Sequence, residues 1–190
     1  MSGIPVNGLV LAGGRSRRMG QDKALLDRDG QSQLAYLASL LDEKVERVFV
    51  STRADQKDDG ERSKYAQIVD RYADMGPLAG ILSAMEEHPD SDWLVVACDL
   101  PNINGETITH LLDNCSKEHP FTAYVSSHDG LPEPLCAIYR ANSVEIGRQF
   151  ADEGIHCPRK ILIRSDTFLL EQTDPGSLDN INTPDDLADS

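Results

Sequence analysis

The sequence predicts a single α/β domain spanning residues 1–190, with a mostly parallel, mixed sheet and helices on both of its faces. Two observations favour this class. Short apolar runs alternate along the chain with segments whose apolar residues recur at helical spacing, which is the pattern of β-α units. The 190 residues are 39% hydrophobic and contain no internal repeat, so one core accounts for the whole chain.

The first half of the chain predicts consecutive β-α units. Val6–Leu11 is an apolar run that stops at two glycines, as a strand does, whereas the charged segment Arg53–Lys64 predicts a loop. Trp93–Ala97 contains no polar residue, which indicates a strand covered on both faces. The other elements are strands at Val48–Val50 and Ala66–Val69 and helices marked by Leu34, Leu37, Leu40 and Leu41, by Leu78, Ile81, Leu82 and Met85, and by Ile108, Leu111, Leu112 and Cys115.

The pattern changes after Pro120. Phe121–Val125 and Leu135–Tyr139 are strand candidates separated by Asp129-Gly130 and two prolines, so we expect antiparallel pairing between them. The remaining elements are a helix at Val144–Phe150, short extended pieces at Ile161–Ile163 and Phe168–Leu170, and a capped helix start at Thr183-Pro184-Asp185-Asp186.

Composition and charge disfavour several classes of function. The formal net charge of −14 opposes sequence-independent binding to nucleic acid or to an anionic membrane, so we expect a small-molecule partner. The four cysteines form no Cys-x-x-Cys pair, which is typical of a protein from the reducing cytoplasm. No signal peptide or membrane-spanning run is evident, and we expect a cytoplasmic protein.

A glycine-rich basic loop directly follows the first predicted strand and runs Leu-Ala-Gly-Gly-Arg-Ser-Arg-Arg-Met-Gly-Gln-Asp-Lys from Leu11 to Lys23. Glycines let backbone N–H groups approach an anion, and the basic side chains add cationic donors. A solvated basic loop is the alternative, but α/β sheets bind ligands where this loop lies. The loop is neither a Walker A loop nor a Gly-x-Gly-x-x-Gly motif. The candidate ligand-binding residues are Leu11, Ala12, Gly13, Gly14, Arg15, Arg18 and Lys23.

Two aspartates follow predicted strands. Asp99 comes after Trp93–Ala97, where a carboxylate suits Mg²⁺, although an Asp that caps the next turn is the alternative. Asp70 could accept hydrogen bonds from N–H donors of a ligand, or it could form a turn. Gly76 and Gly80 enclose a Gly-Pro-Leu-Ala-Gly helix start whose glycines would let a ligand approach the backbone closely.

The glycine-rich loop resembles the signature of the nucleotidyltransferases that include molybdenum cofactor guanylyltransferase. The similarity continues at Asp70 with Gly-Pro-Leu-Ala-Gly, at Cys-Asp-Leu-Pro around Asp99, and at Asn-Ile-Asn-Thr-Pro from Asn180. The resemblance implies a Rossmann-like fold of the nucleotidyltransferase type and Mg²⁺-dependent transfer of GMP from GTP to molybdopterin-bound molybdenum, with release of pyrophosphate. Two alternative functions stay open: that of a cytidylyl or sugar-phosphate nucleotidyltransferase, and that of a non-catalytic carrier that binds GTP or molybdopterin.

The resemblance also implies roles for individual residues. The backbone of Leu11, Ala12 and Gly13 would lie against the base, and Lys23, with Arg18, would act on the phosphates. Ser51, Asp70 and Asp99 would contact the nucleotide or its metal, although Ser51 stands where related enzymes often carry Asn. Asp70 could then accept from the N–H donors of guanine, and Gly76 and Gly80 would admit the base edge or the ribose. Partners would be cofactor-handling proteins or acceptor molybdoenzymes. Candidates for binding the acceptor are Arg159 and Lys160, which could equally form a solvated basic turn, and Asn180 and Asn182.

Overall fold

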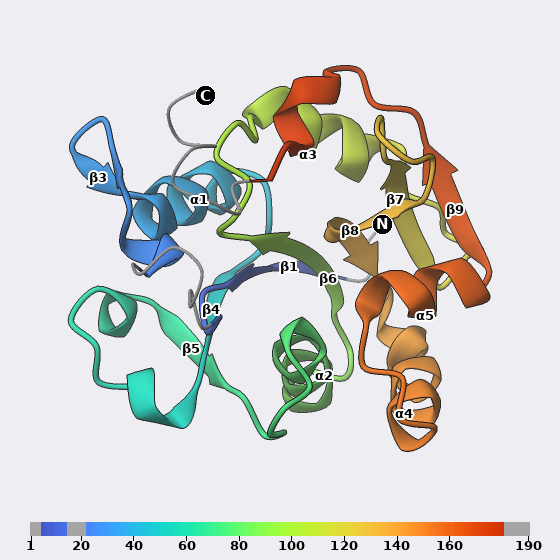
Figure 1. Cartoon of the computed structure of the whole chain (residues 1–190), viewed down its shortest axis with the longest axis horizontal. Helices are drawn as coiled ribbons and strands as arrows, with labels where there is room; N and C mark the ends of the chain where they lie inside the picture. The colour runs from blue at the N-terminus through green and yellow to red at the C-terminus, as the bar shows by residue number, and fades with distance from the viewer. Residues whose placement is uncertain (1–4, 15–21, 181–190) are drawn as a thin grey trace.

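The computed structural model describes residues 5–14 and 22–180 of the chain. Its main sheet has seven strands in the order β5-β4-β1-β6-β8-β7-β9 (Figure 1). Four of its neighbouring strand pairs are parallel, and the two pairs that β8 makes are antiparallel, which confirms the predicted mixed, mostly parallel sheet. The strands are β1 (Val6–Leu11), β4 (Val48–Thr52), β5 (Ala66–Val69), β6 (Asp92–Ala97), β7 (Phe121–Val125), β8 (Pro132–Tyr139) and β9 (Thr167–Leu170).

The parallel strands bring their carboxyl ends to one edge of the sheet. Leu11, the last residue of β1, pairs with Ser51 of β4 on one side and with Ala97 of β6 on the other. Because β8 runs antiparallel to β6, with Cys136 opposite Val96, the amino-terminal half of β8 reaches the same edge. Open α/β sheets bind ligands at this edge, so the topology marks where a site belongs.

Helices cover both faces of the sheet, as predicted. Val10 faces a core that contains α1 and α3, and its neighbour Leu9 faces the opposite core with α2, α4 and α5. Both side chains are fully buried, and burying one such side chain contributes roughly 1.5–3 kcal/mol to folding. The helices are α1 (Gln33–Asp42), α2 (Pro77–Glu87), α3 (Gly105–Asp113), α4 (Val144–Asp152) and α5 (Pro158–Arg164).

One predicted element is wrong and one was missed. Ile161–Ile163 is helical rather than extended and lies in α5, which begins at Pro158 and buries Ile161 and Leu162. A short apolar run does not distinguish a strand from a buried helix by period alone. The chain also forms a small hairpin of β2 (Asp27–Arg28) and β3 (Gln31–Ser32), which no periodicity marks. The helix start predicted at Thr183 lies outside the described residues.

None of the helices in the described segments is long and apolar enough to cross a membrane. The four cysteines are free thiols, and Cys98 and Cys136 are buried. Burial raises the pKa of the Cys98 thiol, so Cys98 packs as a small apolar residue, as expected.

Candidate functional site

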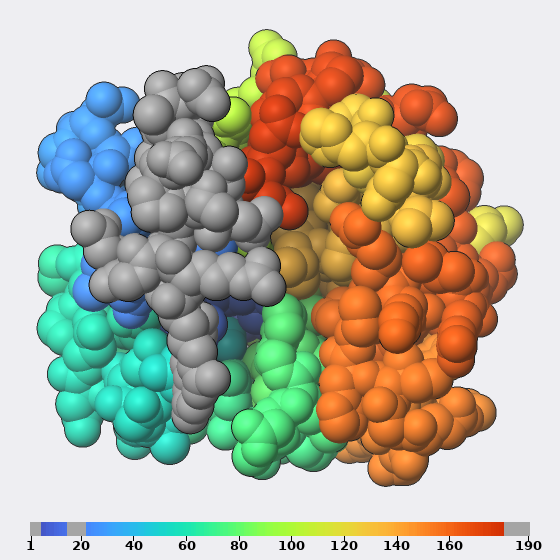
Figure 2. Space-filling model, in the orientation of Figure 1, coloured from blue at the N-terminus to red at the C-terminus, as the bar shows by residue number. Residues whose placement is uncertain are grey.

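A cavity of about 780 Å³ opens at the carboxyl edge of the parallel strands. In Figure 2 the surface recedes at the centre of this face, above the green helix α2. The structure places in its lining every predicted nucleotide-binding residue that it describes. These are Leu11, Ala12, Gly13, Gly14, Lys23, Ser51, Asp70, Gly76, Gly80 and Asp99.

Asp70 and Ser51 form a hydrogen-bonded pair on one wall of the cavity. Ser51 Oγ donates to Asp70 Oδ1 at 2.9 Å. Burial raises the pKa of the Asp70 carboxyl, and Ser51 and the charge of Arg53 partly oppose that rise. A Cβ at Gly13 would lie 3.5 Å from Asp70 Oδ2, an ordinary contact distance, so the loop passes beside this carboxylate. Asp70 Oδ2 is therefore directed at the same space as the glycine-rich loop.

Gly80 lets α2 approach β4 closely. A Cβ there would lie well under 3.0 Å from Ser51 Oγ, closer than side chains tolerate, and 3.1 Å from Leu11 Cδ2, which is a tight contact. The space that Gly80 leaves is thus taken up by Ser51, which in turn holds Asp70. Gly76 precedes the helix with φ of 57°, a conformation that favours glycine. Gly80 lines the cavity, but its immediate contact is with Ser51 rather than with open space.

We expect Gly80→Ala to destabilise the protein by about 1–3 kcal/mol, because the added methyl group overpacks the α2–β4 contact. The melting temperature should fall by about 2–4 °C for each kcal/mol, measured by thermal unfolding. Gly105→Ala is the matched control, since a Cβ at this helix start meets Lys44 and Leu40 only at ordinary contact distances. Equal melting temperatures for the two variants would contradict the packing role of Gly80.

Asp99 lies just past the end of β6, and its Oδ1 atom is buried without a hydrogen-bond partner among the described residues. Burial raises the pKa of the Asp99 carboxyl, and the nearby charge of Lys23 lowers it in part. Lys23 begins the 3₁₀ turn η1 (Lys23–Leu25), which Asp22 caps by accepting from the Ala24 N–H at 3.0 Å. The cavity lining thus contains a carboxylate with one buried oxygen and an ammonium group whose charge acts on it.

The predicted acceptor residues lie outside the lining of this cavity. Arg159 is paired with Asp129 at 3.0 Å and with Glu133 at 3.3 Å, so its charge is already balanced by two carboxylates. Lys160 and Asn180 are exposed. Arg15, Arg18 and Asn182 fall outside the described residues.

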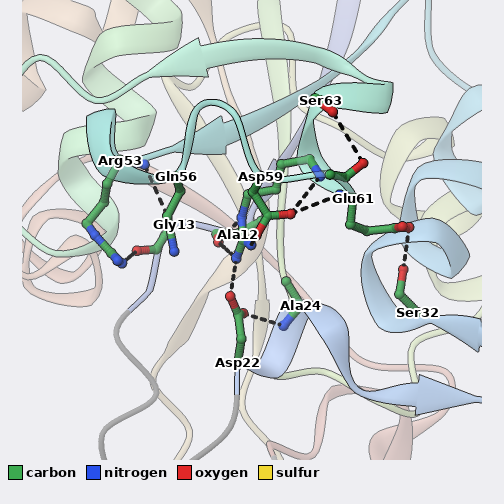
Figure 3. Close-up of polar contacts among 12 residues, drawn as sticks. Ala12, Gly13, Asp22, Ala24, Ser32, Arg53, Gln56, Asp59, Glu61 and Ser63 are labelled. Atoms are coloured by element: carbon green, nitrogen blue, oxygen red, sulfur yellow. Dashed lines mark hydrogen bonds and ion pairs between the residues drawn. The ribbon is translucent and has the colours of Figure 1, made fainter.

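Several side chains that line or support the cavity were not predicted from the sequence. Arg53, Asp22 and Tyr72 line the cavity, and Arg62 lies buried behind the loop. Arg53 donates to the Gly13 carbonyl, as Figure 3 shows. Asp22 had a usable signal, because an Asp before a short turn is a common cap. The two arginines lie in a charged loop in which nothing in the local sequence indicates which side chain folds inward.

Comparisons with known proteins agree with this geometry. A family model described as a MobA-like NTP transferase domain matches residues 8–168. The chain is 37% identical over 188 residues to the molybdenum cofactor biosynthesis bifunctional protein of Synechocystis sp., covering 99% of this chain and 54% of that protein. It is 36% identical over 136 residues to a probable molybdenum cofactor guanylyltransferase of Bacillus mycoides, covering 70% of this chain and 66% of that protein.

The chain therefore aligns with between about half and two thirds of the length of these two relatives. Among solved structures, molybdopterin-guanine dinucleotide biosynthesis protein A from Archaeoglobus fulgidus is similar with a TM-score of 0.80 and 25% identity, covering 96% of this chain and 95% of that one. A family match over most of the chain, together with the site built at the strand edge, leads to one conclusion: the chain belongs to the MobA-like NTP transferase domain family.

Proposed function

We propose that this chain transfers GMP from GTP to molybdopterin-bound molybdenum cofactor, forming the guanine dinucleotide cofactor and pyrophosphate. The observation that carries the proposal is the single cavity in which the glycine-rich loop, Lys23 and the buried Asp99 meet at the strand edge. The names of the Bacillus and Archaeoglobus relatives support guanine as the base and molybdopterin as the acceptor.

The reaction is an in-line displacement at the α-phosphorus of GTP. A phosphate oxygen of the acceptor forms a new bond to that phosphorus while the bond to the bridging oxygen breaks, and pyrophosphate leaves with the electron pair. Lys23 supplies positive charge where the triphosphate lies, and the backbone of Gly13 and Gly14 approaches the nucleotide. The protein therefore acts by positioning and electrostatic stabilisation, and no covalent enzyme intermediate is required.

Mg²⁺ fits this site through Asp99. The buried Asp99 Oδ1 atom has no hydrogen-bond partner within residues 5–14 and 22–180. Mg²⁺ typically takes one or two protein carboxylates together with waters and substrate phosphates. When bound, the ion neutralises charge on the phosphate oxygens. Asp99 would hold it, and Lys23 would stand on the phosphate side.

The deciding experiment offers the purified protein Mg²⁺, molybdenum cofactor and each of the four nucleoside triphosphates, with the dinucleotide product identified by mass. We expect product from GTP. Product from CTP alone would assign the chain to the cytidylyl branch. Binding of GTP without product from any nucleotide would assign it to the carriers.

We expect Asp70→Asn to narrow the preference for GTP over CTP by about tenfold or more. A carboxylate accepts from both N–H donors of the guanine edge, whereas an amide presents a donor to one of them. The Asn carbonyl still accepts from Ser51 Oγ, so the wall keeps its geometry. The measurement is kcat/KM for GTP and CTP, with Asp58→Asn, an exposed loop position, as the control. An unchanged ratio would leave guanine to be recognised by backbone groups.

A further inference from the structure

A fully buried arginine lies behind the glycine-rich loop and outside the cavity lining. Arg62 begins the 3₁₀ turn η3 (Arg62–Lys64), and its side chain has no solvent exposure. Its Nε and Nη2 atoms donate to the Ala12 carbonyl at 3.0 and 2.5 Å, and Nη2 also lies 2.6 Å from Asp22 Oδ2. Nη1 lies 3.0 Å from Asp59 Oδ2. Figure 3 shows Ala12, Asp22 and Asp59 converging on this position.

These contacts satisfy a charge that is costly to bury. A guanidinium removed from water is stable only when carboxylates and carbonyls pair with its N–H groups. Here Asp22 and Asp59 supply two carboxylates, and the Ala12 carbonyl accepts from two nitrogens. Apolar packing alone would have filled the same volume without that cost. The arrangement therefore points to a geometric task for the planar fork of the arginine.

Arg62 connects two segments that are separate in the sequence, the end of β1 and the turn at Lys23. Ala12 directly follows β1, while Asp22 caps the turn that begins at Lys23. One guanidinium therefore joins Ala12, the first residue after the strand, to Asp22, the cap of the turn that begins at Lys23. The two ends of the glycine-rich segment are held at a fixed separation by a single side chain.

The same contact orients a backbone donor. In a planar trans peptide, a carbonyl and the N–H of the next residue point in opposite directions. Because Arg62 lies outside the cavity lining and holds the Ala12 carbonyl, the Gly13 N–H is turned away from Arg62. Gly13 lines the cavity, and Arg53 holds the next carbonyl in the loop. The two peptide groups on either side of Gly13 are thus arranged before any ligand arrives.

We propose that Arg62 is a positioning residue that ties the Ala12 carbonyl to the Asp22 cap and so presets the backbone around Gly13, together with Lys23, for the nucleotide. The identity of that nucleotide rests on the proposed function, but the positioning of Ala12 and Asp22 by Arg62 does not. A purely structural arginine would support folding without any specific effect on the loop.

The test compares Arg62→Lys with Asp59→Asn in the full chain. Arg62→Lys keeps the charge, but one ammonium cannot span Ala12, Asp22 and Asp59 together. Asp59→Asn weakens the ion pair at Arg62 Nη1 but leaves the contacts of Nε and Nη2 with Ala12 and Asp22 in place, so it serves as the matched control. Without nucleotide, hydrogen exchange of the Ala12 and Ala24 amides should speed up about tenfold or more in Arg62→Lys, while α2 stays unchanged.

Nucleotide binding provides the second readout. We expect the Kd for Mg²⁺-GTP, measured by calorimetry, to rise about tenfold or more in Arg62→Lys and to stay within about threefold in Asp59→Asn, since small misplacements are costly in preorganised sites. Asp22→Asn keeps the cap acceptor but loses the charge toward Arg62, and it should show the same loop exchange if Arg62→Lys does not fold.

Two results would overturn the proposed positioning role of Arg62. One is wild-type exchange at Ala12 and Ala24 in both Arg62→Lys and Asp22→Asn. The other is an equal loss of GTP binding in Asp59→Asn and Arg62→Lys, which would show a general loss of stability. If the wild-type protein neither binds GTP nor transfers GMP, the proposed function fails, and the exchange data still decide whether Arg62 orders the loop.

Discussion

Asp99→Asn is expected to reduce GMP transfer by about 10³-fold or more, which corresponds to roughly 4 kcal/mol of transition-state stabilisation. A neutral amide is a far weaker Mg²⁺ ligand than a carboxylate, and Asp99 is the buried carboxylate whose Oδ1 atom is left for a ligand at the end of β6. The measurement is kcat/KM for GTP across a range of Mg²⁺ concentrations. An unchanged Mg²⁺ dependence in the folded variant would move the metal to other residues.

The same substitution should stabilise the free protein at neutral pH by about 1 kcal/mol, since it removes a charge that burial disfavours. The folded pKa of Asp99 is raised above its unfolded value. The folded state therefore holds the proton more tightly, and this contribution to stability is present at low pH and is lost as pH rises from the unfolded to the folded pKa. The difference in melting temperature between Asp99→Asn and wild type should accordingly grow from acidic to neutral pH. Asp90→Asn, at an exposed position, should show no such trend.

Lys23→Ala is expected to lower kcat/KM for GTP by about 10²–10³-fold, because it removes positive charge from the place where charge develops on the triphosphate. Lys23 lies at the first position of η1, and the cap from Asp22 to Ala24 does not use its side chain. The charge of Lys23 also partly offsets the cost of burying Asp99, so the free energy of unfolding should fall by about 1 kcal/mol at neutral pH, far less than the loss in kcat/KM.

Steady-state kinetics and thermal unfolding of the purified variant check both parts of the expectation for Lys23. Lys57→Ala, an exposed lysine in the loop after β4, is the matched control and should leave turnover unchanged. Near-normal turnover in Lys23→Ala would remove Lys23 from the catalytic machinery. A loss of equal size in both variants would indicate a general electrostatic effect on the approach of GTP.

Much of the fold could be predicted because short apolar runs marked most of its strands and helical spacing marked most of its helices. Ala66–Val69 is a strand over the predicted residues, and Phe121–Val125 pairs antiparallel with β8 as expected. The prediction of an extended piece at Ile161–Ile163 was wrong, because these residues lie in the helix α5. Three apolar residues carry no period, and burial of two of them against the sheet by a helix is a tertiary outcome.

The residues of the site that follow parallel strands could be predicted as a group. Leu11, Asp70 and Asp99 each lie at or just past a strand end, and parallel strands bring such ends to one edge. Ser51 lies near the end of β4 and was expected from the family resemblance alone. The acceptor side could not be found in this way. Arg159 appeared available in the sequence, but the fold places Asp129 and Glu133 against it.

Local spacing along the chain was enough to predict the alternation of strands and helices, the glycine-rich loop and the carboxylates that follow the strands. Contacts between distant segments place Arg62 on the Ala12 carbonyl and make Gly80 leave room for Ser51. The physical reason is that the energy of burying a charge, or of leaving out a methyl group, is set by atoms far away in the sequence. No local pattern carries that information.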